Sequence, residues 1–492
     1  MSGDGRLTHV LDPSDRGQDE CGVFGVWAPG EQVSHLTYFG LYALQHRGQE
    51  AAGIAASDGD KIFVYKDTGL VSQVFNEDAL STLRGYIAIG HTRYSTAGAS
   101  TWANAQPMLG PTDFGTVALA HNGNLVNVAE LAAELHEISG ADLRGELRHG
   151  SSTDTAILTG LMGALDGFES LEDLAADLLP RLRGAFSLVF MDERTLYAAR
   201  DPHGFRPLVL GRLEMGWVVA SETAALDIVD AQFVREVEPG ELLIIDDDGV
   251  RSRRFAPASP RGCVFEHVYL ARPDTWISGR NINSVRNAMG ARLAVEHPVD
   301  ADIVIATPDS GTPAAIGYAQ KSGISYAQGL VKNAYVGRTF IQPTQAMRQL
   351  GIRLKLNPLR EVIEGKRIVV VDDSIVRGNT QRQLVRMLRQ AGAAEVHVRI
   401  SSPPVSWPCF FGIDFPTRGE LIANALSHDE ICASIGADTL GYLSLEGMYE
   451  AIGLPENQLC SACFTGDYPV PVDVHAEYLA KHPDLSIRLT TV

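Results

Sequence analysis

The segment 246–261 (DDDGVRSRRFAPASPR) separates two parts of the chain whose hydrophobic patterns differ. Before it, short strands of small residues come first, then helical stretches, then further strands. After it, compact apolar strands alternate with helices. A charged, proline-containing segment without periodicity is typical of a linker. Because one core rarely serves 492 residues, the sequence predicts two or three domains, with a linker at this position.

The first part is expected to form an α+β sandwich. Strands that come before and after a group of helices allow the helices to cover paired sheets. The strands are predicted at 48–54, 86–89, 116–120, 186–191, 195–199, 217–220 and 241–245, and the helices at 128–138, 154–165 and 171–182.

The second part is expected to form a parallel α/β sheet, because strands that alternate with helices favour that arrangement. Its strands are predicted at 302–306, 324–326, 367–371 and 395–400, and its helices at 312–322 and 380–390. The sequence therefore suggests the domain boundaries 21–256 and 257–455, with a C-terminal extension at 456–492.

Composition excludes several classes of protein. The chain has 41 Lys and Arg against 60 Asp and Glu, a formal net charge of −19, which makes general nucleic-acid binding unfavourable. No run of 18 apolar residues predicts a membrane span, and residues 1–20 lack the apolar stretch of a secretory signal. Six cysteines in this length do not form a disulfide scaffold, so a reducing cytoplasm is expected.

Residues 367–380 (RIVVVDDSIVRGNT) predict a buried strand, a loop and a helix. Ligands of open α/β sheets bind beyond the C-terminal ends of the strands. Backbone N–H groups of 374–380 would offer donors and a helix dipole to a phosphate. Asp372 and Asp373 would repel a phosphate and suit ribose hydroxyls or Mg²⁺. The alternative is an ordinary strand–loop–helix connection, which is common in α/β proteins.

Three segments of this part resemble type I phosphoribosyltransferases. Residues 370–380 resemble the phosphoribosyl pyrophosphate signature, although Asn379 stands where threonine is more usual, and 308–311 (PDSG) and 332–339 (KNAYVGRT) resemble two further segments. The resemblance implies that Mg²⁺ is held by Ser310, Asp372 and Asp373. It implies phosphoribosyl pyrophosphate binding by Asp372, Asp373, Ser374, Arg377, Gly378, Asn379, Thr380, Lys332, Tyr335 and Arg338.

Cys21 in the first part, taken alone, is a candidate core thiol. Four other segments change this interpretation, namely 44–49 (LQHRGQ), 90–96 (GHTRYST), 121–124 (HNGN) and 152–154 (STD). In this order and spacing, they resemble the class II glutamine amidotransferases, whose amidohydrolase domain is an αββα sandwich of the N-terminal nucleophile (Ntn) type.

That resemblance implies a role for each matching residue. Removal of a propeptide, residues 1–20, would free the α-amine of Cys21 as a base beside its nucleophilic thiol, and the reference pKa of such an amine, about 7.7–8.0, suits this task. The side chain of Asn122 and the N–H of Gly123 would stabilise the oxyanion. The glutamine would be bound by Arg93 at its carboxylate and Asp154 at its ammonium, with Arg47 positioning the site. His91 and His121 are expected to be structural.

Cys460 and Cys463 form a C-x-x-C, which suits redox chemistry, zinc or iron–sulfur. With Cys263 and Cys409 they could complete a four-cysteine site for zinc or a 4Fe–4S cluster, and scattered free thiols are the alternative. The flanks of these cysteines resemble the iron–sulfur branch of one family, which implies a 4Fe–4S cluster on these four residues. Cys432 has no such context and is expected to be a buried thiol.

Both parts together resemble the amidophosphoribosyltransferase family. The resemblance implies that ammonia from glutamine displaces pyrophosphate from phosphoribosyl pyrophosphate in purine biosynthesis, with purine nucleotides as inhibitors and a homotetrameric assembly. Two alternatives are a different class II amidotransferase, such as an aminosugar synthase, and a phosphoribosyl pyrophosphate-sensing regulator without catalysis. The aspartate pair argues against the first alternative, and Cys21 with its oxyanion motif argues against the second.

Overall fold

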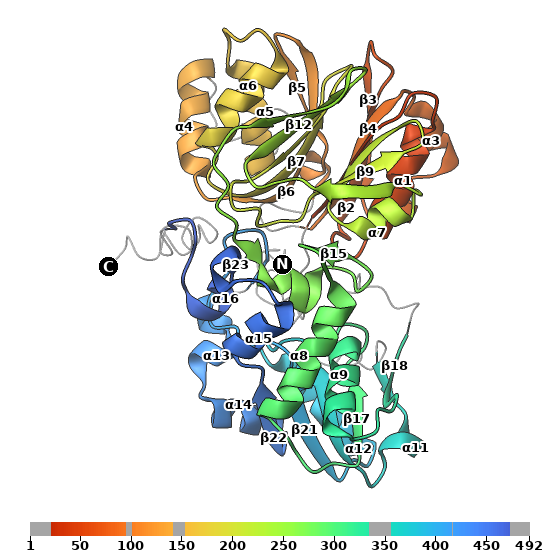
Figure 1. Cartoon of the computed structure of the whole chain (residues 1–492), viewed down its shortest axis with the longest axis vertical. Helices are drawn as coiled ribbons and strands as arrows, with labels where there is room; N and C mark the ends of the chain where they lie inside the picture. The colour runs from red at the N-terminus through yellow and green to blue at the C-terminus, as the bar shows by residue number, and fades with distance from the viewer. Residues whose placement is uncertain (1–20, 95–100, 141–152, 334–355, 416, 473–492) are drawn as a thin grey trace, which may run out of the picture.

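The computed structural model describes residues 21–94, 101–140, 153–333, 356–415 and 417–472. The expectations for the propeptide 1–20, for Tyr335 and for Arg338 lie outside these residues. Figure 1 shows two lobes: the upper one holds β1 to β13 and the lower one holds the elements from α8 onward. Within the described ranges, no helix is long and apolar enough to cross a membrane.

The first lobe contains two antiparallel sheets. One has seven strands in the order β11-β9-β10-β1-β4-β2-β3, and the other has six in the order β13-β12-β8-β7-β6-β5. Their bounds are β1 Gly22–Trp27, β2 Ala51–Ser57, β3 Ile62–Thr68, β4 Ile87–Arg93, β5 Met108–Thr112, β6 Gly115–Leu125, β7 Gly184–Met191, β8 Leu196–Arg200, β9 Val209–Leu213, β10 Gly216–Ala220, β11 Gln232–Glu236, β12 Glu241–Asp246 and β13 Gly249–Arg254.

Helices cover both outer faces of this pair of sheets. Side chains such as Val23, Ile89 and Val189 form a core between the sheets, while separate cores lie under the helices on either side. The helices are α1 Val33–Ala43, α2 Val71–Val74, α3 Glu77–Thr82 and α7 Thr223–Asp227 on one side, and α4 Val128–Ser139, α5 Asp154–Ala164 and α6 Leu171–Leu178 on the other. The expected αββα sandwich is confirmed.

The second lobe is built on a four-stranded parallel sheet, β17-β20-β21-β22. Alternate residues of β20 point to opposite faces, so Val369 packs with α8 and α9, whereas Ile368 packs with α12 and α14. The expected parallel α/β domain is therefore confirmed. The bounds are β17 Ile303–Ala306, β20 Arg367–Asp372, β21 Glu395–Ile400, β22 Thr439–Tyr442, α8 Ile282–Glu296, α9 Thr312–Ser322, α12 Asn379–Gln390, α14 His428–Ile435 and α15 Leu445–Ile452.

The short pairs β14 Gly262–Cys263 with β23 Leu459–Cys460, β15 Trp276–Ile277 with β16 Arg280–Asn281, and β18 Leu330–Lys332 with β19 Leu356–Pro358 complete the strands. The remaining short helices are α11 Arg360–Ile363, α13 Ile422–Ala425 and α16 Ala462–Thr465.

The linker expectation is partly wrong. Residues Gly249–Arg254 form β13 and pair with β12 at the edge of the second sheet. This strand is largely exposed and carries charged residues, so it lacks the apolar alternation that indicates a strand. Residues 324–326 form only an isolated bridge, Val304 to Tyr326. The sequence interpretation also missed α8, whose apolar side chains are interrupted by Asn and Arg.

Candidate active sites and cysteine pocket

Cys21 lies directly before β1 and is half-buried. Its Sγ donates to the carbonyl of Tyr94 at 3.5 Å, and its own carbonyl accepts from Arg47 Nε at 3.1 Å. Strand β1 pairs with β4, placing Gly22 opposite Thr92. The candidate nucleophile is therefore fixed at the end of a strand, next to the segment that contains Arg93.

Asn122 and Gly123 lie on β6, which contacts β1 across the sandwich. Neither polar atom of the fully buried Asn122 side chain has a hydrogen-bond partner among the described residues. An unpaired buried amide is unfavourable unless a ligand completes it. Gly123 has φ +139°, and an added Cβ would lie 2.1 Å from the carbonyl oxygen of Ala185. The unpaired amide suits a site that a ligand completes, whereas the glycine is required by the close approach of β7.

Asp154 begins α5, and its carboxylate accepts from the N–H groups of Leu125 at 3.2 Å and Thr155 at 2.8 Å. Burial alone would raise the pKa of Asp154, but His121 and these N–H groups outweigh it and lower that pKa. Asp154 therefore stays ionised, as a partner for an ammonium group must. Arg93, at the end of β4, is also buried.

His91 and His121 make contacts that fit structural roles. The Nε2 of His91 lies 3.1 Å from the carbonyl of His121, and burial lowers the pKa of His91 to about 3. His121 Nδ1 lies 3.6 Å from Asp154 Oδ2. A neutral, enclosed His91 is a poor proton acceptor at ordinary pH.

Arg47 lies behind Cys21, at the boundary of the two lobes. Besides the Cys21 carbonyl, it binds Glu222 through Nη1 at 2.6 Å and Glu266 through Nη2 at 2.7 Å. Its side chain is 1% exposed. These contacts suit a residue that orients Cys21.

Asp372 is the last residue of β20 and Asp373 follows it directly, so the carboxylates lie at the predicted strand end, and both are fully buried. Asp373 accepts from Ser310 Oγ at 2.5 Å and from Ser374 Oγ at 2.6 Å, while Asp372 accepts from Gln381. The tertiary structure thus brings the segment at 308–311 against the aspartate pair. Carboxylate and hydroxyl oxygens are ligands that Mg²⁺ accepts.

The loop after Asp373 leads into α12, whose first residue is Asn379. Gly378 has φ +78°, and a Cβ there would lie 2.6 Å from Ile422. The positive φ of this glycine allows the chain to turn directly into α12. The backbone N–H groups of the first helical turn, including that of Thr380, lie there. Arg382 donates to Asn379 Oδ1 at 3.0 Å, and Arg377 pairs with Glu420 at 3.6 Å.

Lys332 lies on β18 and pairs with Asp309. The contact joins two of the segments that sequence analysis selected, since Asp309 belongs to 308–311. Tyr335 and Arg338 lie beyond the described part of this segment.

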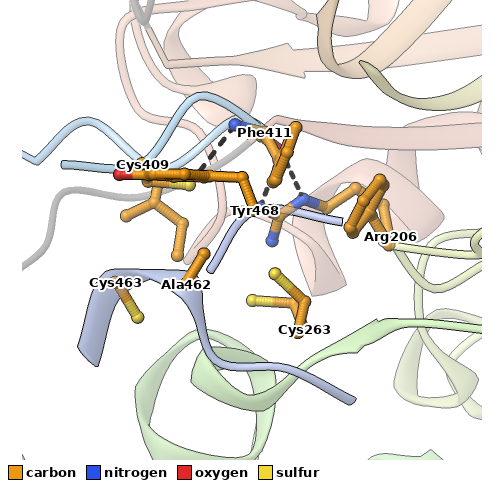
Figure 2. Close-up of a pocket in the computed structure, with 10 residues that line it drawn as sticks. Arg206, Cys263, Cys409, Phe411, Ala462, Cys463 and Tyr468 are labelled. Carbon is orange, nitrogen blue, oxygen red and sulfur yellow. Dashed lines mark hydrogen bonds between the residues drawn. The ribbon is translucent and has the colours of Figure 1, made fainter. Parts of the chain in front are cut away.

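All four candidate ligand cysteines line one small pocket, with Arg206, Phe411 and Tyr468 among its other residues (Figure 2). Burial raises the pKa of Cys460 to about 12, and burial with the neighbouring Cys263 raises that of Cys463. Thiols so placed are stable as neutral groups unless bound metal stabilises their thiolates. The expected ligand residues Cys263, Cys409, Cys460 and Cys463 thus come together in the described structure.

In the described part of the chain, no three His, Cys, Asp or Glu side chains form a group that could hold a single metal ion. A tetrahedral zinc ion requires sulfurs at about 2.3 Å from one point. Four cysteine thiols around one pocket are a donor set that both a structural zinc ion and an iron–sulfur cluster accept. Cys432 lies elsewhere, in α14.

Sequence reasoning missed several buried polar residues around these sites. Glu222 and Glu266 bind Arg47, and Arg206 binds Glu266 at 3.4 Å. Their partners are distant in the sequence, and no local pattern marks them. The available signal for Glu266 was its position three residues after Cys263, in the flank 262–266 (GCVFE) that resembles the iron–sulfur branch.

A family model described as a glutamine amidotransferase domain matches residues 91–228. The chain is 64% identical to the amidophosphoribosyltransferase of Mycobacterium tuberculosis over 92% of this chain and 87% of that protein. It is 50% identical to that of Bacillus subtilis over 92% of this chain and 95% of that protein.

The structure of glutamine phosphoribosylpyrophosphate amidotransferase from B. subtilis, complexed with ADP and GMP, matches with a TM-score of 0.85 and 49% identity. The match covers 92% of this chain and 98% of that chain. These relatives extend over both lobes, so the aminosugar-synthase alternative is wrong and the resemblance found in the motifs is confirmed. The chain belongs to the amidophosphoribosyltransferases, glutamine amidotransferases of purine biosynthesis.

Proposed function

We propose that Cys21 is the nucleophile of the glutaminase half-reaction. Its thiol attacks the side-chain amide carbon of glutamine, and its α-amine, freed by removal of residues 1–20, takes the thiol proton and passes it to the departing ammonia. Water then hydrolyses the thioester to glutamate. Arg93 binds the glutamine carboxylate and Asp154 its ammonium group, which fixes the amide near Cys21.

The observation that carries this proposal is the buried Asn122 side chain, for which the described residues provide no hydrogen-bond partner. An oxyanion that forms on the amide oxygen would accept from the Asn122 amide and from the Gly123 N–H, which stabilises charge that appears only during the reaction. The close contact of Gly123 with the Ala185 carbonyl explains why no side chain fits there.

In the second lobe, phosphoribosyl pyrophosphate binds at the C-terminal end of β20. Asp372 and Asp373 bind the ribose hydroxyls, and the loop from Ser374 to Thr380 binds the 5-phosphate through backbone N–H groups and hydroxyls. Lys332, Tyr335 and Arg338 bind the pyrophosphate. Ammonia replaces pyrophosphate at C1 of the ribose, and phosphoribosylamine and pyrophosphate result.

Two cofactors fit the residues. Mg²⁺, held by Ser310, Asp372 and Asp373 together with the substrate, would neutralise charge on the leaving pyrophosphate. A 4Fe–4S cluster on the four pocket cysteines has no redox step to perform in this reaction, so its contribution would be to join distant segments of the chain.

Regulation is proposed by extension from a relative. The B. subtilis structure is described as a complex with ADP and GMP, and we extend this to purine nucleotides as feedback inhibitors of the present chain. A homotetramer in the cytoplasm is proposed, with ammonia passing from Cys21 to the second lobe inside the protein.

One assay tests the function. Purified protein should release glutamate from glutamine in the presence of phosphoribosyl pyrophosphate and Mg²⁺, and pyrophosphate should appear in equal amount. Glutamate without matching pyrophosphate would reject the transferase half. Absence of both products, with tight binding of phosphoribosyl pyrophosphate, would favour the non-catalytic regulator.

A further inference from the structure

Glu266 comes from the second half of the sequence, yet its carboxylate lies against the glutaminase site. It begins a π-helical turn, Glu266–Leu270, of a kind that is rare and frequent at functional sites. The carboxylate accepts from Arg47 twice, from Nη2 at 2.7 Å and from Nη1 at 3.0 Å. Its side chain is 2% exposed, so water does not compete effectively for these bonds.

This two-point contact determines where the third nitrogen of Arg47 points. A guanidinium is planar, and its donors form a rigid fork. With Nη1 and Nη2 held by Glu266, the Nε–H of Arg47 is directed at the Cys21 carbonyl, 3.1 Å away. Glu222 binds Nη1 as well, at 2.6 Å, and fixes the same plane.

Glu266 is itself held on its far side. Arg206 Nη1 lies 3.4 Å from Glu266 Oε1, and the Nε and Nη2 of Arg206 donate to the Phe411 carbonyl at 3.0 and 2.7 Å. Arg286 donates to the backbone carbonyls of Glu266 and His267 at 3.4 and 2.8 Å. The carboxylate therefore cannot move without displacing several buried arginines.

We propose that Glu266 is a positioning residue for Cys21, and that it acts through Arg47. The inference rests on the proposed role of Cys21 as nucleophile and base. In a processed chain, Cys21 has no preceding residue to restrain it. The hydrogen bond from Arg47 to the Cys21 carbonyl therefore limits where the thiol and α-amine of Cys21 lie. A displacement of about 1 Å at a reacting group can reduce a rate about 10²-fold.

The effect should appear in glutaminase kcat. For Glu266→Gln we expect kcat to fall about 10- to 100-fold and synthesis from ammonia to stay unchanged. The glutamine KM should stay within about two-fold, because the proposed glutamine-binding residues Arg93 and Asp154 are retained. Glu266→Asp keeps the charge and should recover part of kcat. Glu296→Gln removes another largely buried carboxylate, which binds Ser444 and Arg292, and should behave as wild type.

A double-mutant cycle shows whether Glu266 acts through Arg47. Arg47→Lys removes the fork and the Nε donor, so adding Glu266→Gln to it should lower kcat little further. The alkylation rate of the Cys21 thiol by iodoacetamide, followed by peptide mass spectrometry, should change in Glu266→Gln and stay unchanged in Glu296→Gln.

Additive losses in the cycle, or wild-type kcat in both Glu266 variants, would overturn the inference. Ammonia-dependent synthesis reports whether each variant is folded. If Glu266→Gln fails to fold, the same cycle is measured with Glu266→Asp, alone and combined with Arg47→Lys. The proposed function fails in a different way, namely if Cys21→Ala keeps glutaminase activity. An inactive Cys21→Ala with fully active Glu266 variants would reject this inference alone.

Discussion

Cys263 and Cys460 are direct partners in the parallel pair β14–β23, although the whole parallel sheet lies between them in sequence. The pairing brings the entrance of the second lobe against its C-terminal end. Cys463 follows one turn later on α16, and Cys409 reaches the same pocket from the segment after β21. A group bound to all four thiols would therefore link three distant segments.

The first prediction concerns this pocket. Anaerobically purified protein should be brown and contain about four irons per chain, because all four candidate ligand thiols line one pocket. Cys460→Ser should reduce iron content and yield unstable protein, since metal binding and folding are coupled. Cys432→Ser, outside the pocket, is the matched control and should be nearly silent. Zinc in place of iron would contradict the assignment.

Cys21→Ala should abolish glutamine-dependent synthesis and leave synthesis from high ammonia intact, because the two reactions occur in separate lobes. Intact-mass measurement of the active wild-type protein should also show a chain that begins at Cys21. Full activity with residues 1–20 retained would contradict the α-amine as base.

Asn122→Ala should lower glutaminase kcat about 10²- to 10³-fold, as expected for loss of one oxyanion donor. The same substitution should not destabilise the protein. The wild-type amide is buried without a described partner, so removing it should leave the midpoint of thermal unfolding unchanged or higher. A lower midpoint with unchanged kcat would assign Asn122 to the core instead.

Asp372→Asn combined with Asp373→Asn should abolish phosphoribosylamine formation and preserve basal glutaminase activity. Both carboxylates are buried at the ligand end of β20, and Asp373 holds Ser310. Asp300→Asn is a suitable control, because Asp300 is exposed and pairs with Arg367 at the start of the strand. Loss of both activities in a folded protein would indicate that the sites depend on each other.

Glu222 should make stability depend on pH in the acid range. Burial alone would raise the pKa of Glu222, but contacts with His46, Arg47 and Thr275 outweigh it and hold that pKa well below the ordinary 4.5. A depressed carboxyl pKa means that the unfolded chain binds more protons below pH 4.5. Ionised Glu222 therefore contributes fully to the free energy of unfolding above pH 4.5, and this contribution falls as the pH drops toward the pKa of Glu222 in the folded protein.

Urea midpoints at pH 6 and pH 4 measure this effect. Glu222→Gln should lose about 1–3 kcal/mol at pH 6, because Arg47 loses one charged partner but keeps Glu266. Between pH 6 and pH 4, the free energy of unfolding should also fall less in the variant than in the wild type. The difference should be up to about 1.4 kcal/mol per pH unit. An equal pH dependence in both proteins would show that Glu222 is not ionised in the wild type.

The sequence by itself determined the two fold classes, the aspartate pair at a strand end and the order of motifs around Cys21. These features are local: apolar periodicity follows from which face a strand or helix buries, and motifs are contiguous residues. The edge strand Gly249–Arg254 escaped prediction for the same reason, because its side chains are mostly exposed and its pairing with β12 gives no apolar pattern.

Only the tertiary structure decided which distant residues meet. Glu266 contacts Arg47, and Ser310 contacts Asp373, across long separations in sequence. Such contacts depend on how sheets pack and lobes join, and a buried carboxylate leaves no periodic trace in its neighbours. The sequence thus supplied the reacting groups, whereas packing decided what holds them, because burial strengthens a charge pair only where another part of the chain excludes water.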